Sequence, residues 1–492
     1  MLNLTKTTVP SAASPSDHRM PGPAQTADSP ALVSPTTRAR AAIRRPIRTL
    51  LAAAFCLAII HPSTPAHAEP PTPADRQRWE EAGLRVLSSP HLTLVTDLPS
   101  SPAVDQLPQV FEQACPQWEA YFGLTPGQLD PWHVTGSLIV DRERFRRAGL
   151  FPDTLPEFPF GYQLDDRLWM FDQPSDYYRR HLLLHEGTHA IVRHLTNTQG
   201  PPWYIEGLAE LLATHRLDDR HQLTLNVIPA NRQAVPMWGR LKIVREAAAA
   251  KQVPSFADVA AYDSTAHRQL SAYAWSWVAQ LLLDHHPRYN GAGRDMLDRL
   301  NDRPAEFYQE LLHRLGPAAK HLEADWQILT SELDFGYDVA RGAITTYPDD
   351  PSAPNSKTPA GGPVTREPAS ETMSVAAERS WQLTPWRVEP GRPLHLTAEG
   401  RVVLGTDPRP WESEPQGVTV EYYRGRPLGE LSAMVYWDEP AEDGRRWSDW
   451  VPVGRDSQLE FNRPGWLYLR ANEAPGALGD NSGAYTVRVR PD

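Results

Sequence analysis

The sequence has very little cysteine, with two residues in a chain of 492. Cys56 lies in an apolar N-terminal run that we expect to be removed on export, so the mature chain would keep Cys115 alone, which we expect to lie buried in a helix. A single cysteine forms no intramolecular disulfide. This excludes a disulfide-held scaffold and leaves the hydrophobic cores to hold the fold.

Positively charged residues are fewer than negatively charged ones, with 49 Lys and Arg against 60 Asp and Glu. The formal net charge is −11, and residues 1–68 hold seven Lys and Arg against two Asp and Glu, so the rest of the chain is more acidic than the total. An acidic chain argues against nucleic acid and anionic membrane surfaces as partners. The length exceeds what one domain usually holds, so we expect more than one domain.

Residues 1–68 have the pattern of a signal or targeting segment. Residues 50–60 form an apolar run, which is short for a membrane span, and Ala66 and Ala68 give a small-x-small cleavage pattern. The arginines that precede the run are Arg38, Arg40, Arg44, Arg45 and Arg48. We predict export to the periplasm, the cell surface or the medium. Anchoring by an uncleaved signal segment is the alternative.

A run with helical spacing contains the pattern H-E-x-x-H at His185, Glu186 and His189. Residues four apart share one face of a helix, so His185 and His189 can bind one metal ion from the same side. Glu186 lies about 100° further round, within reach of a water on that metal. The alternative is an amphipathic core helix whose histidines lie near its surface.

A second segment, residues 201–210, reads P-P-W-Y-I-E-G-L-A-E. With the H-E-x-x-H pattern, it resembles the gluzincin clan of zinc metallopeptidases, through His185, Glu186, His189, Trp203, Glu206, Gly207, Ala209 and Glu210. The resemblance implies that Glu206, which follows His189 after sixteen intervening residues, is the third zinc ligand. It implies that Glu210 orients a zinc-binding imidazole. A solvated helix residue is the alternative for Glu210.

Four more histidines lie near the motif: His181, His194, His215 and His221. His181 precedes His185 by one turn and is an alternative ligand. None has the paired spacing with an adjacent general base, so we expect surface or supporting roles for all four.

The resemblance also extends to a Y-A-x-S-W pattern that begins at Tyr273. In related gluzincins a tyrosine near this position hydrogen-bonds the developing oxyanion, which implies a catalytic role for Tyr273. Tyr262 and His267 are rivals for that role, and a buried core tyrosine is the structural alternative.

The predicted fold is an α+β, zincin-like metallopeptidase domain over residues 69–344, with a small sheet and a helical bundle. Strands are expected at 91–96, at 134–140 and at 162–171, the last as a strand or a hairpin arm. Helices are expected at 74–84, 102–122, 142–150, 209–215, 238–250, 271–283, 296–311 and 316–333. In the family resembled, an edge strand holds the peptide substrate in extended form. Residues 163–170 are the strand we predict for this.

Residues 345–375 are rich in Pro, Ser and Gly and are predicted to be a linker. From 376 to 492, short strand-like runs alternate with turns, which predicts an antiparallel β-sandwich. Its last part, around residues 469–489, is similar to the calcium loop of bacterial galactose-binding lectins. The resemblance implies a Ca²⁺ site with side-chain oxygens from Glu473, Asp480 and Asn481 and the carbonyls of Ala477 and Leu404. The loop after Gly405 differs from the lectins, and a purely structural sandwich is the alternative.

These patterns together predict an exported zinc metallopeptidase, with Zn²⁺ held by His185, His189 and Glu206 and with Glu186 as general base. Its partners would be a peptide or protein substrate and a carbohydrate bound by the C-terminal domain. Two alternatives stay open: a catalytically silent carbohydrate- or surface-binding protein, and a zinc hydrolase of non-peptide bonds.

Overall fold

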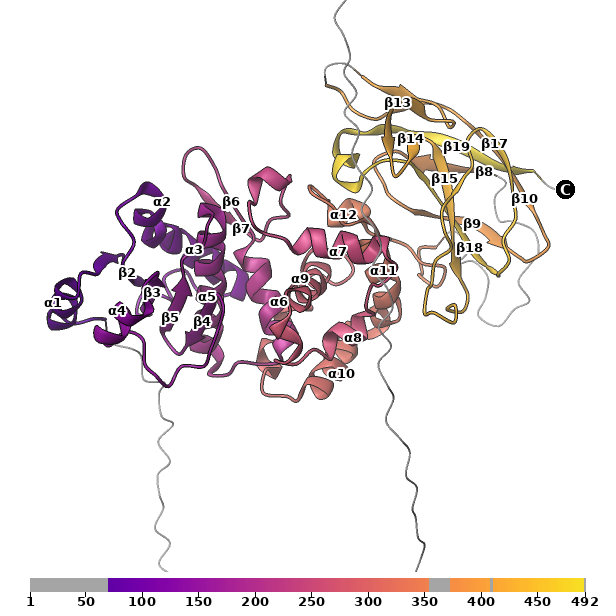
Figure 1. The fold of residues 1–492 in the computed structure, drawn as a ribbon. Coiled ribbons are helices and arrows are strands. Elements are labelled where there is room, and N and C mark those ends of the chain that lie inside the picture. Colours follow the sequence, from indigo (N-terminus) through magenta and orange to yellow (C-terminus); the bar gives the residue numbers. More distant parts are fainter. Residues whose placement is uncertain (1–69, 354–371, 408–409, 491–492) are drawn as a thin grey trace, which may run out of the picture. The chain divides into compact units, whose positions relative to one another are not determined.

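The computed structural model describes residues 70–353, 372–407 and 410–490 (Figure 1). The first range combines helices with a five-stranded sheet, and the other two form a sandwich-like set of antiparallel sheets, so the predicted α+β layout followed by β-structure is confirmed. The predicted export segment and Cys56 lie outside the described residues. None of the helices in the described ranges is long and apolar enough to cross a membrane.

The five-stranded sheet has the order β1-β2-β3-β5-β4. The central strands β2, β3 and β5 are parallel, and β1 and β4 are antiparallel to their neighbours. All five residues of β2 are buried, as in a strand covered on both faces. The strand bounds are β1 (Arg85–Ser88), β2 (Leu92–Thr96), β3 (Val134–Ile139), β4 (Gly161–Leu164) and β5 (Arg167–Phe171).

β4 is the last strand at one edge of the sheet, and it pairs with β5 on its inner side. The expectation that residues 163–170 form one edge strand is therefore wrong, because these residues span the end of β4, a turn and most of β5, which lies inside the sheet. The turn consists of two residues, Asp165 and Asp166, and Asp165 has a φ of 49°. This two-residue turn joins β4 and β5 into a hairpin, the alternative that the sequence analysis left open for residues 162–171.

Four helices accompany the sheet: α1 (Pro73–Glu81), α2 (Pro102–Asp105), α3 (Leu107–Phe122) and α4 (Arg142–Arg147). α3 packs on β2 and on α5 and buries Phe111, Ala114 and Trp118. Cys115 is also buried within α3, as predicted.

Three long helices form the centre of the helical part: α5 (Asp176–Thr196), α6 (Pro202–Ala213) and α9 (Leu270–His285). α5 lies beside β4 and β5 and packs on α6, which packs on α9 (Figure 1). Two glycines allow close packing, Gly187 between α5 and α3 and Gly207 between α6 and α9. A β-carbon on Gly187 would lie 2.8 Å from the Trp118 ring, and one on Gly207 would lie 2.3 Å from the carbonyl oxygen of Ser276.

The remaining elements before the linker are β6 (His215–Leu217), β7 (Leu223–Leu225), η1 (Arg232–Ala234), α7 (Arg240–Ala249), α8 (Phe256–Ala260), η2 (Ala266–Arg268), η3 (Arg294–Arg299), α10 (Pro304–Leu315), η4 (Gly316–His321), α11 (Leu322–Glu332) and α12 (Val339–Gly342). The single helix expected at 296–311 is wrong. It is divided into η3 and α10, because Pro304 starts a new helix at its first position.

The C-terminal part contains two larger antiparallel sheets. One has the strand order β12-β11-β19-β10-β17, with β8 also paired to β19, and the other has the order β16-β15-β18-β9. The strands β13 and β14 pair with each other in a separate two-stranded sheet. Its elements are β8 (Thr372–Ala376), β9 (Gln382–Val388), β10 (Leu394–Glu399), β11 (Val402–Val403), β12 (Glu412–Ser413), β13 (Val418–Tyr423), β14 (Arg426–Leu428), β15 (Leu431–Trp437), β16 (Val451–Pro452), β17 (Asp456–Leu459), β18 (Gly465–Ala471), η5 (Pro475–Asp480) and β19 (Ser482–Arg490).

β8 begins at Thr372 and Tyr347 is fully buried, so packed structure is present at both ends of the segment predicted as a linker, residues 345–375.

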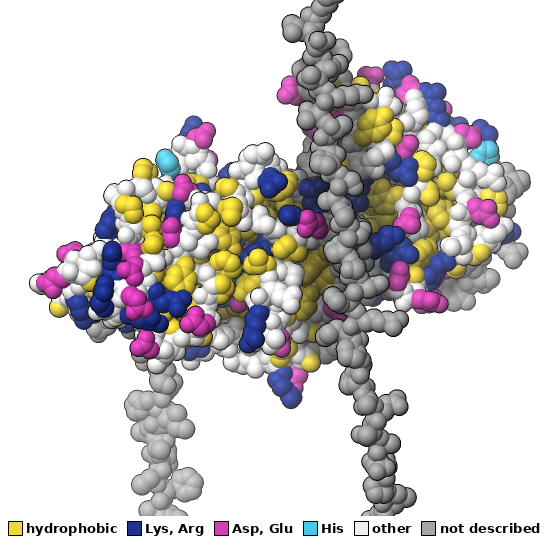
Figure 2. Space-filling model, in the orientation of Figure 1, with side chains coloured by type: hydrophobic (Ala, Val, Ile, Leu, Met, Phe, Trp, Pro, Cys, Tyr) yellow, Lys and Arg dark blue, Asp and Glu magenta, His cyan; other side chains and the backbone are white. Residues whose placement is uncertain are grey.

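β9 was not predicted because Pro385 interrupts its strand pattern. The structure tolerates this proline because β9 is an edge strand. On the face drawn in Figure 2, acidic and basic side chains are interspersed over the described surface.

Candidate metal centre

The H-E-x-x-H motif lies in the middle of α5. The Ser175 hydroxyl caps this helix by accepting a hydrogen bond from the backbone N–H of Tyr178 at 3.0 Å, and the helix continues unbroken to Thr196. His185 and His189 project from one face, and their Nε2 atoms lie 3.1 Å apart. The helical spacing alone therefore brings the two imidazoles together.

The α6 helix adds a carboxylate to these two imidazoles. The Oε2 atom of Glu206 lies 3.2 Å from Nε2 of His185 and 3.3 Å from Nε2 of His189. A tetrahedral zinc ion with bonds of about 2.0–2.1 Å separates its ligand atoms by about 3.3–3.4 Å. The three atoms already have nearly this spacing, so the residues predicted as ligands fit one zinc ion.

The electrostatics of the three atoms also suit a cation. Glu206 Oε2 is buried and accepts no hydrogen bond among the described residues. Burial alone would raise the pKa of Glu206, but His189 and His185 hold that pKa well below its ordinary value, so the carboxylate is charged. Two ring nitrogens and a charged oxygen face one another, an arrangement that a divalent cation would stabilise.

Glu210, one turn after Glu206, is 1% exposed and is not a solvated residue. Its Oε1 atom lies 3.6 Å from Nδ1 of His185, slightly longer than a hydrogen bond. Arg240 of α7 donates two hydrogen bonds to its oxygens, at 2.7 and 3.1 Å. Burial raises the pKa of Glu210, but Arg240 and His181 lower it well below its usual range. A charged, fixed carboxylate therefore lies behind the His185 ring.

Glu186 follows the first ligand of the motif and is 5% exposed. The edge strand β4 passes directly over it, because a β-carbon on Gly161 would lie 2.2 Å from Glu186 Oε1. Burial raises the pKa of Glu186 to about 8, against the lowering effect of His189. The carboxyl group thus lies between the metal ligands and the edge of the sheet.

Tyr273 extends from α9 towards the same centre. Its ring centroid lies 6.2 Å from that of His185, and the guanidinium of Arg240 lies 5.4 Å from it. Burial, together with the charge of Glu206, raises the pKa of Tyr273, so the hydroxyl keeps its proton and can donate a hydrogen bond.

The two rivals of Tyr273 have other surroundings. Both ring nitrogens of His267 have partners at 3.0 Å, the carbonyl oxygen of Asp263 and the hydroxyl of Ser276. Tyr262 lies against His267, with ring centroids 6.1 Å apart. Of the three, Tyr273 is the residue whose ring contacts an imidazole of the centre.

The other histidines near the motif do not join the three ligands. His181 lies 3.3 Å from Glu210, and the positive charge of Arg240 beside this pair disfavours a cation there. The rings of His215 and His181 both face the carbonyl oxygen of Ala213, and burial lowers the pKa of His215 to about 3. His194 contacts the ring of Trp132, and His221 is exposed.

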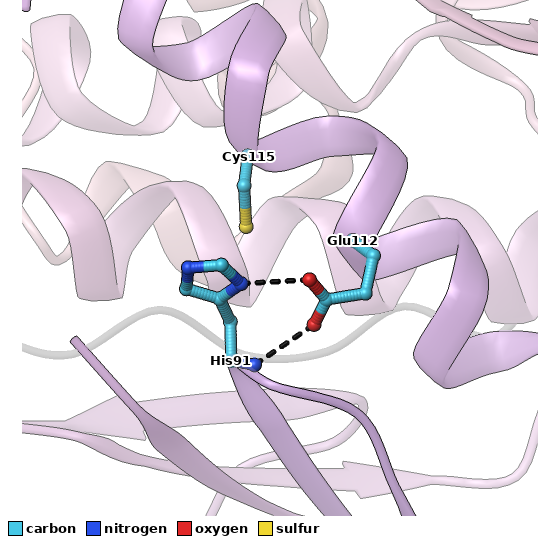
Figure 3. Close-up of side chains that lie close together, drawn as sticks. All are labelled: His91, Glu112 and Cys115. Carbon is cyan, nitrogen blue, oxygen red and sulfur yellow. Dashed lines mark hydrogen bonds and ion pairs between the residues drawn. The ribbon is translucent and has the colours of Figure 1, made fainter. Parts of the chain in front are cut away.

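Another group of metal-ligating residue types lies between β2 and α3 and consists of His91, Glu112 and Cys115 (Figure 3). Both oxygens of Glu112 are occupied by His91, one by its backbone N–H at 2.8 Å and one by its Nδ1 at 2.7 Å. Burial raises the pKa of the Cys115 thiol well above its ordinary value, which disfavours the thiolate that metals bind. His91 and Glu112 therefore already have each other as partners.

The structure brings together part of the predicted calcium site. Glu473 and Asn481 are buried, and the Asn481 amide donates a hydrogen bond to Glu473 Oε2 at 2.7 Å. The Asn481 Oδ1 atom is buried without a hydrogen-bond partner among the described residues. Asp480 is near enough to raise the pKa of Glu473. Glu473 and Asn481 are therefore in contact, whereas a ligand role for them, for Asp480 and for the carbonyls of Ala477 and Leu404 stays a prediction.

Comparisons with known proteins add little to this geometry. No protein-family model matches the chain, and no curated protein matches it either. One solved structure with similarity is described as "EclA N-terminal domain; PllA-like lectin". It is 19% identical, and the match covers 24% of this chain and 94% of that chain, with a TM-score of 0.19. A TM-score this low does not establish a shared fold.

Two residues of the centre were missed by the sequence analysis. Arg240 lies 30 positions after Glu210, and an arginine at the start of an alanine-rich helix carries no signal that it is buried. Gly161 has no motif around it, and its role follows from the close approach of β4 to Glu186.

Proposed function

We propose that the chain is a zinc-dependent hydrolase that cleaves peptide bonds, with a zincin-like arrangement of its sheet and helices. The observation that carries this proposal is the spacing of 3.1 to 3.3 Å among His185, His189 and Glu206, with Glu186 beside them. Zinc held by these three residues would lower the pKa of a bound water and polarise a carbonyl group.

Glu186 is the general base of the proposed reaction. It takes a proton from the attacking water and delivers it to the leaving amine. A carboxyl group with a pKa near 8 can both accept and return a proton near neutral pH, and a bound cation would lower that value. Its buried position keeps it close to the reacting atoms and away from bulk water.

Tyr273 is the proposed hydrogen-bond donor to the oxyanion that develops on the substrate carbonyl. Its raised pKa keeps the phenol protonated, which this role requires. Arg240 supports the centre in two ways, because it pairs with Glu210 and lies 5.4 Å from the Tyr273 ring.

A peptide is the favoured substrate because a free sheet edge lies beside the proposed base. β4 pairs with β5 on one side and is the last strand of the sheet on the other. An extended peptide can add to such an edge through its main chain, whatever its side chains. A hydrolase of non-peptide bonds has no comparable use for this edge.

Metal analysis and a cleavage assay test the proposal together. The purified full chain should bind one equivalent of zinc, and each of H185A, H189A and E206A should lose it. Cleavage of a peptide library should stop when a chelator is added and return with zinc. Folded protein that takes up zinc without cleaving any peptide would favour the silent surface-binding alternative, and protein that takes up no zinc would refute the metal centre.

We also propose that the C-terminal part binds Ca²⁺ through Glu473, Asp480 and Asn481, and that it is the part that would contact a carbohydrate. The buried, unpartnered Asn481 oxygen supports a cation here. Calorimetry with Ca²⁺ should show heat of binding, and its absence would remove calcium from the account. Export remains a prediction from residues 1–68, to be checked by N-terminal sequencing of secreted protein.

A further inference from the structure

A cavity of about 560 Å³ opens next to the metal centre. Its walls are formed by residues 163–165 at the end of β4, Arg193 near the end of α5, residues 197–202 between α5 and α6, and residues 300–302 with Pro304. It is one helical turn from the metal ligands on two helices, because Arg193 follows His189 by four residues and Pro202 precedes Glu206 by four. The cavity is therefore a neighbour of the centre and not part of it.

β4 connects the proposed base to this cavity. Gly161 at its start lies against Glu186, and Asp165 just after its end lies 3.3 Å from Arg193 in the cavity wall. A strand advances about 3.3 Å per residue. Consider a peptide that pairs with the free edge of β4 and has its cleaved bond beside Glu186. The peptide residue two or three positions from that bond would then place its side chain at the cavity.

The charges in the cavity wall are already paired. Arg193 lies 3.3 Å from Asp165 and donates a hydrogen bond to the carbonyl oxygen of Asn197 at 2.7 Å. Asp302 accepts hydrogen bonds from Arg299, with a closest approach of 2.6 Å. A charged substrate group would meet no free countercharge among these residues.

Uncharged amides are the groups that remain available. The side chains of Asn197, Gln199 and Asn301 line the cavity and are exposed, and they make no hydrogen bond to any other described residue. Each offers both a donor and an acceptor. Such a wall suits a ligand that carries neutral donors and acceptors of its own.

We propose that this cavity is a subsite for an uncharged, hydrogen-bonding side chain of the substrate, two or three residues from the cleaved bond. The amide of Asn or Gln and the hydroxyls of a sugar on Ser or Thr share this chemistry. The volume lies in the range of small-molecule sites, which leaves room for a sugar ring. The proposal rests on the proposed peptidase function.

The test uses the zinc-loaded full chain and one peptide scaffold that it cleaves. The second and third positions on each side of the cleaved bond are varied among Gln, glycosylated Ser, Glu, Lys and Leu. At one position, kcat/KM for Gln or for glycosylated Ser should exceed that for the other three by about fivefold, the effect of one neutral hydrogen bond. Whichever of the two is preferred identifies the source of the hydrogen-bonding group.

The double variant Gln199→Ala, Asn301→Ala should abolish this preference, and Asn290→Ala, an exposed amide elsewhere, should retain it. Preference for a charged or apolar residue, no preference at any position, or a preference that survives the double variant would overturn the subsite. If no peptide is cleaved, binding to the zinc-loaded E186Q variant by fluorescence anisotropy supplies the same comparison. Failure of zinc uptake would instead refute the peptidase function itself.

Discussion

Gly161 and Glu186 are in contact across the gap between the sheet edge and the helix α5. The approach is so close that a β-carbon at position 161 would lie 2.2 Å from Oε1 of the carboxylate, well inside the distance that real β-carbons keep. The edge strand therefore holds the carboxyl group of the proposed base in place. A side chain at position 161 would have to displace this carboxylate, whereas the backbone angles of Gly161 are not in the left-handed region that favours glycine.

Gly161→Ala should displace Glu186 without removing a metal ligand. A shift of about 1 Å in a catalytic group can cost about 10²-fold in rate, so we expect a loss of that order in kcat with zinc content unchanged. Gly239→Ala is the matched control, since its added β-carbon meets no atom within 4 Å. Equal activity in the two variants would show that β4 does not position Glu186.

Glu186→Gln should separate metal binding from proton transfer. The amide is nearly the same size as the carboxyl group but cannot accept the proton, so we expect about 10²–10⁴-fold lower kcat. Zinc content, measured by elemental analysis, should stay at one equivalent because Glu186 is not a ligand. Full activity in this variant would reject Glu186 as the general base.

Arg240→Met should weaken both the fold and the metal site. The substitution leaves the buried charge of Glu210 without its arginine partner, and such a loss typically costs about 3–5 kcal/mol in the free energy of unfolding. Zinc affinity should also fall about 10–100-fold, because Glu210 would no longer be held in place behind His185. Arg245→Met on the same helix is the control. Arg245 pairs with Asp334 at the surface, where an ion pair is worth about 1 kcal/mol or less. Chemical denaturation and zinc titration of both variants make the comparison, and indistinguishable results would argue against a supporting role for Glu210.

Tyr273→Phe should lower kcat by about 10²–10³-fold with little change in KM, because the lost hydroxyl is proposed to act on the oxyanion and not on the bound substrate. Tyr262→Phe removes the hydroxyl of a tyrosine that contacts His267 instead. Steady-state kinetics on one peptide substrate distinguish the two. A large loss in the Tyr262 variant with none in the Tyr273 variant would transfer the role to the rival.

The sequence predicted which residues meet at the candidate metal centre far better than it predicted their surroundings. His185 and His189 share a helix face because of helical geometry alone, so their proximity follows from spacing. Glu206 was placed through the resemblance to gluzincins, and α6 does bring it within 3.3 Å of both imidazoles.

The residues that complete the centre come from distant parts of the chain, where no local pattern applies. Arg240 and Gly161 reach it through the packing of α7 and β4, and neither position differs in local sequence from a surface arginine or a loop glycine. The strand β9 was hidden for a different reason, because Pro385 breaks its strand pattern and only its edge position makes that proline tolerable.

The raised pKa of Glu473 predicts how the free energy of unfolding depends on pH and on calcium. Burial, together with the charge of Asp480, raises the pKa of Glu473 from an ordinary value of 4.5 to about 7, although the hydrogen bond from Asn481 lowers it. Below pH 4.5 the group is protonated in both the folded and the unfolded chain. Between pH 4.5 and 7 the unfolded chain loses the proton first, so stability should fall as the pH rises through this window and reach its lower level above 7.

Calcium should reverse this loss, because a bound cation stabilises the ionised carboxylate. We expect Ca²⁺ to raise the melting temperature clearly at pH 8 and much less at pH 5. Glu473→Gln should remove both the calcium effect and most of the pH-dependent loss, whereas Glu399→Gln, an exposed acid paired with Arg488, should change neither. Thermal melts at the two pH values, with and without Ca²⁺, decide the matter. An equal calcium shift in wild type and in the Glu473 variant would place any bound ion elsewhere.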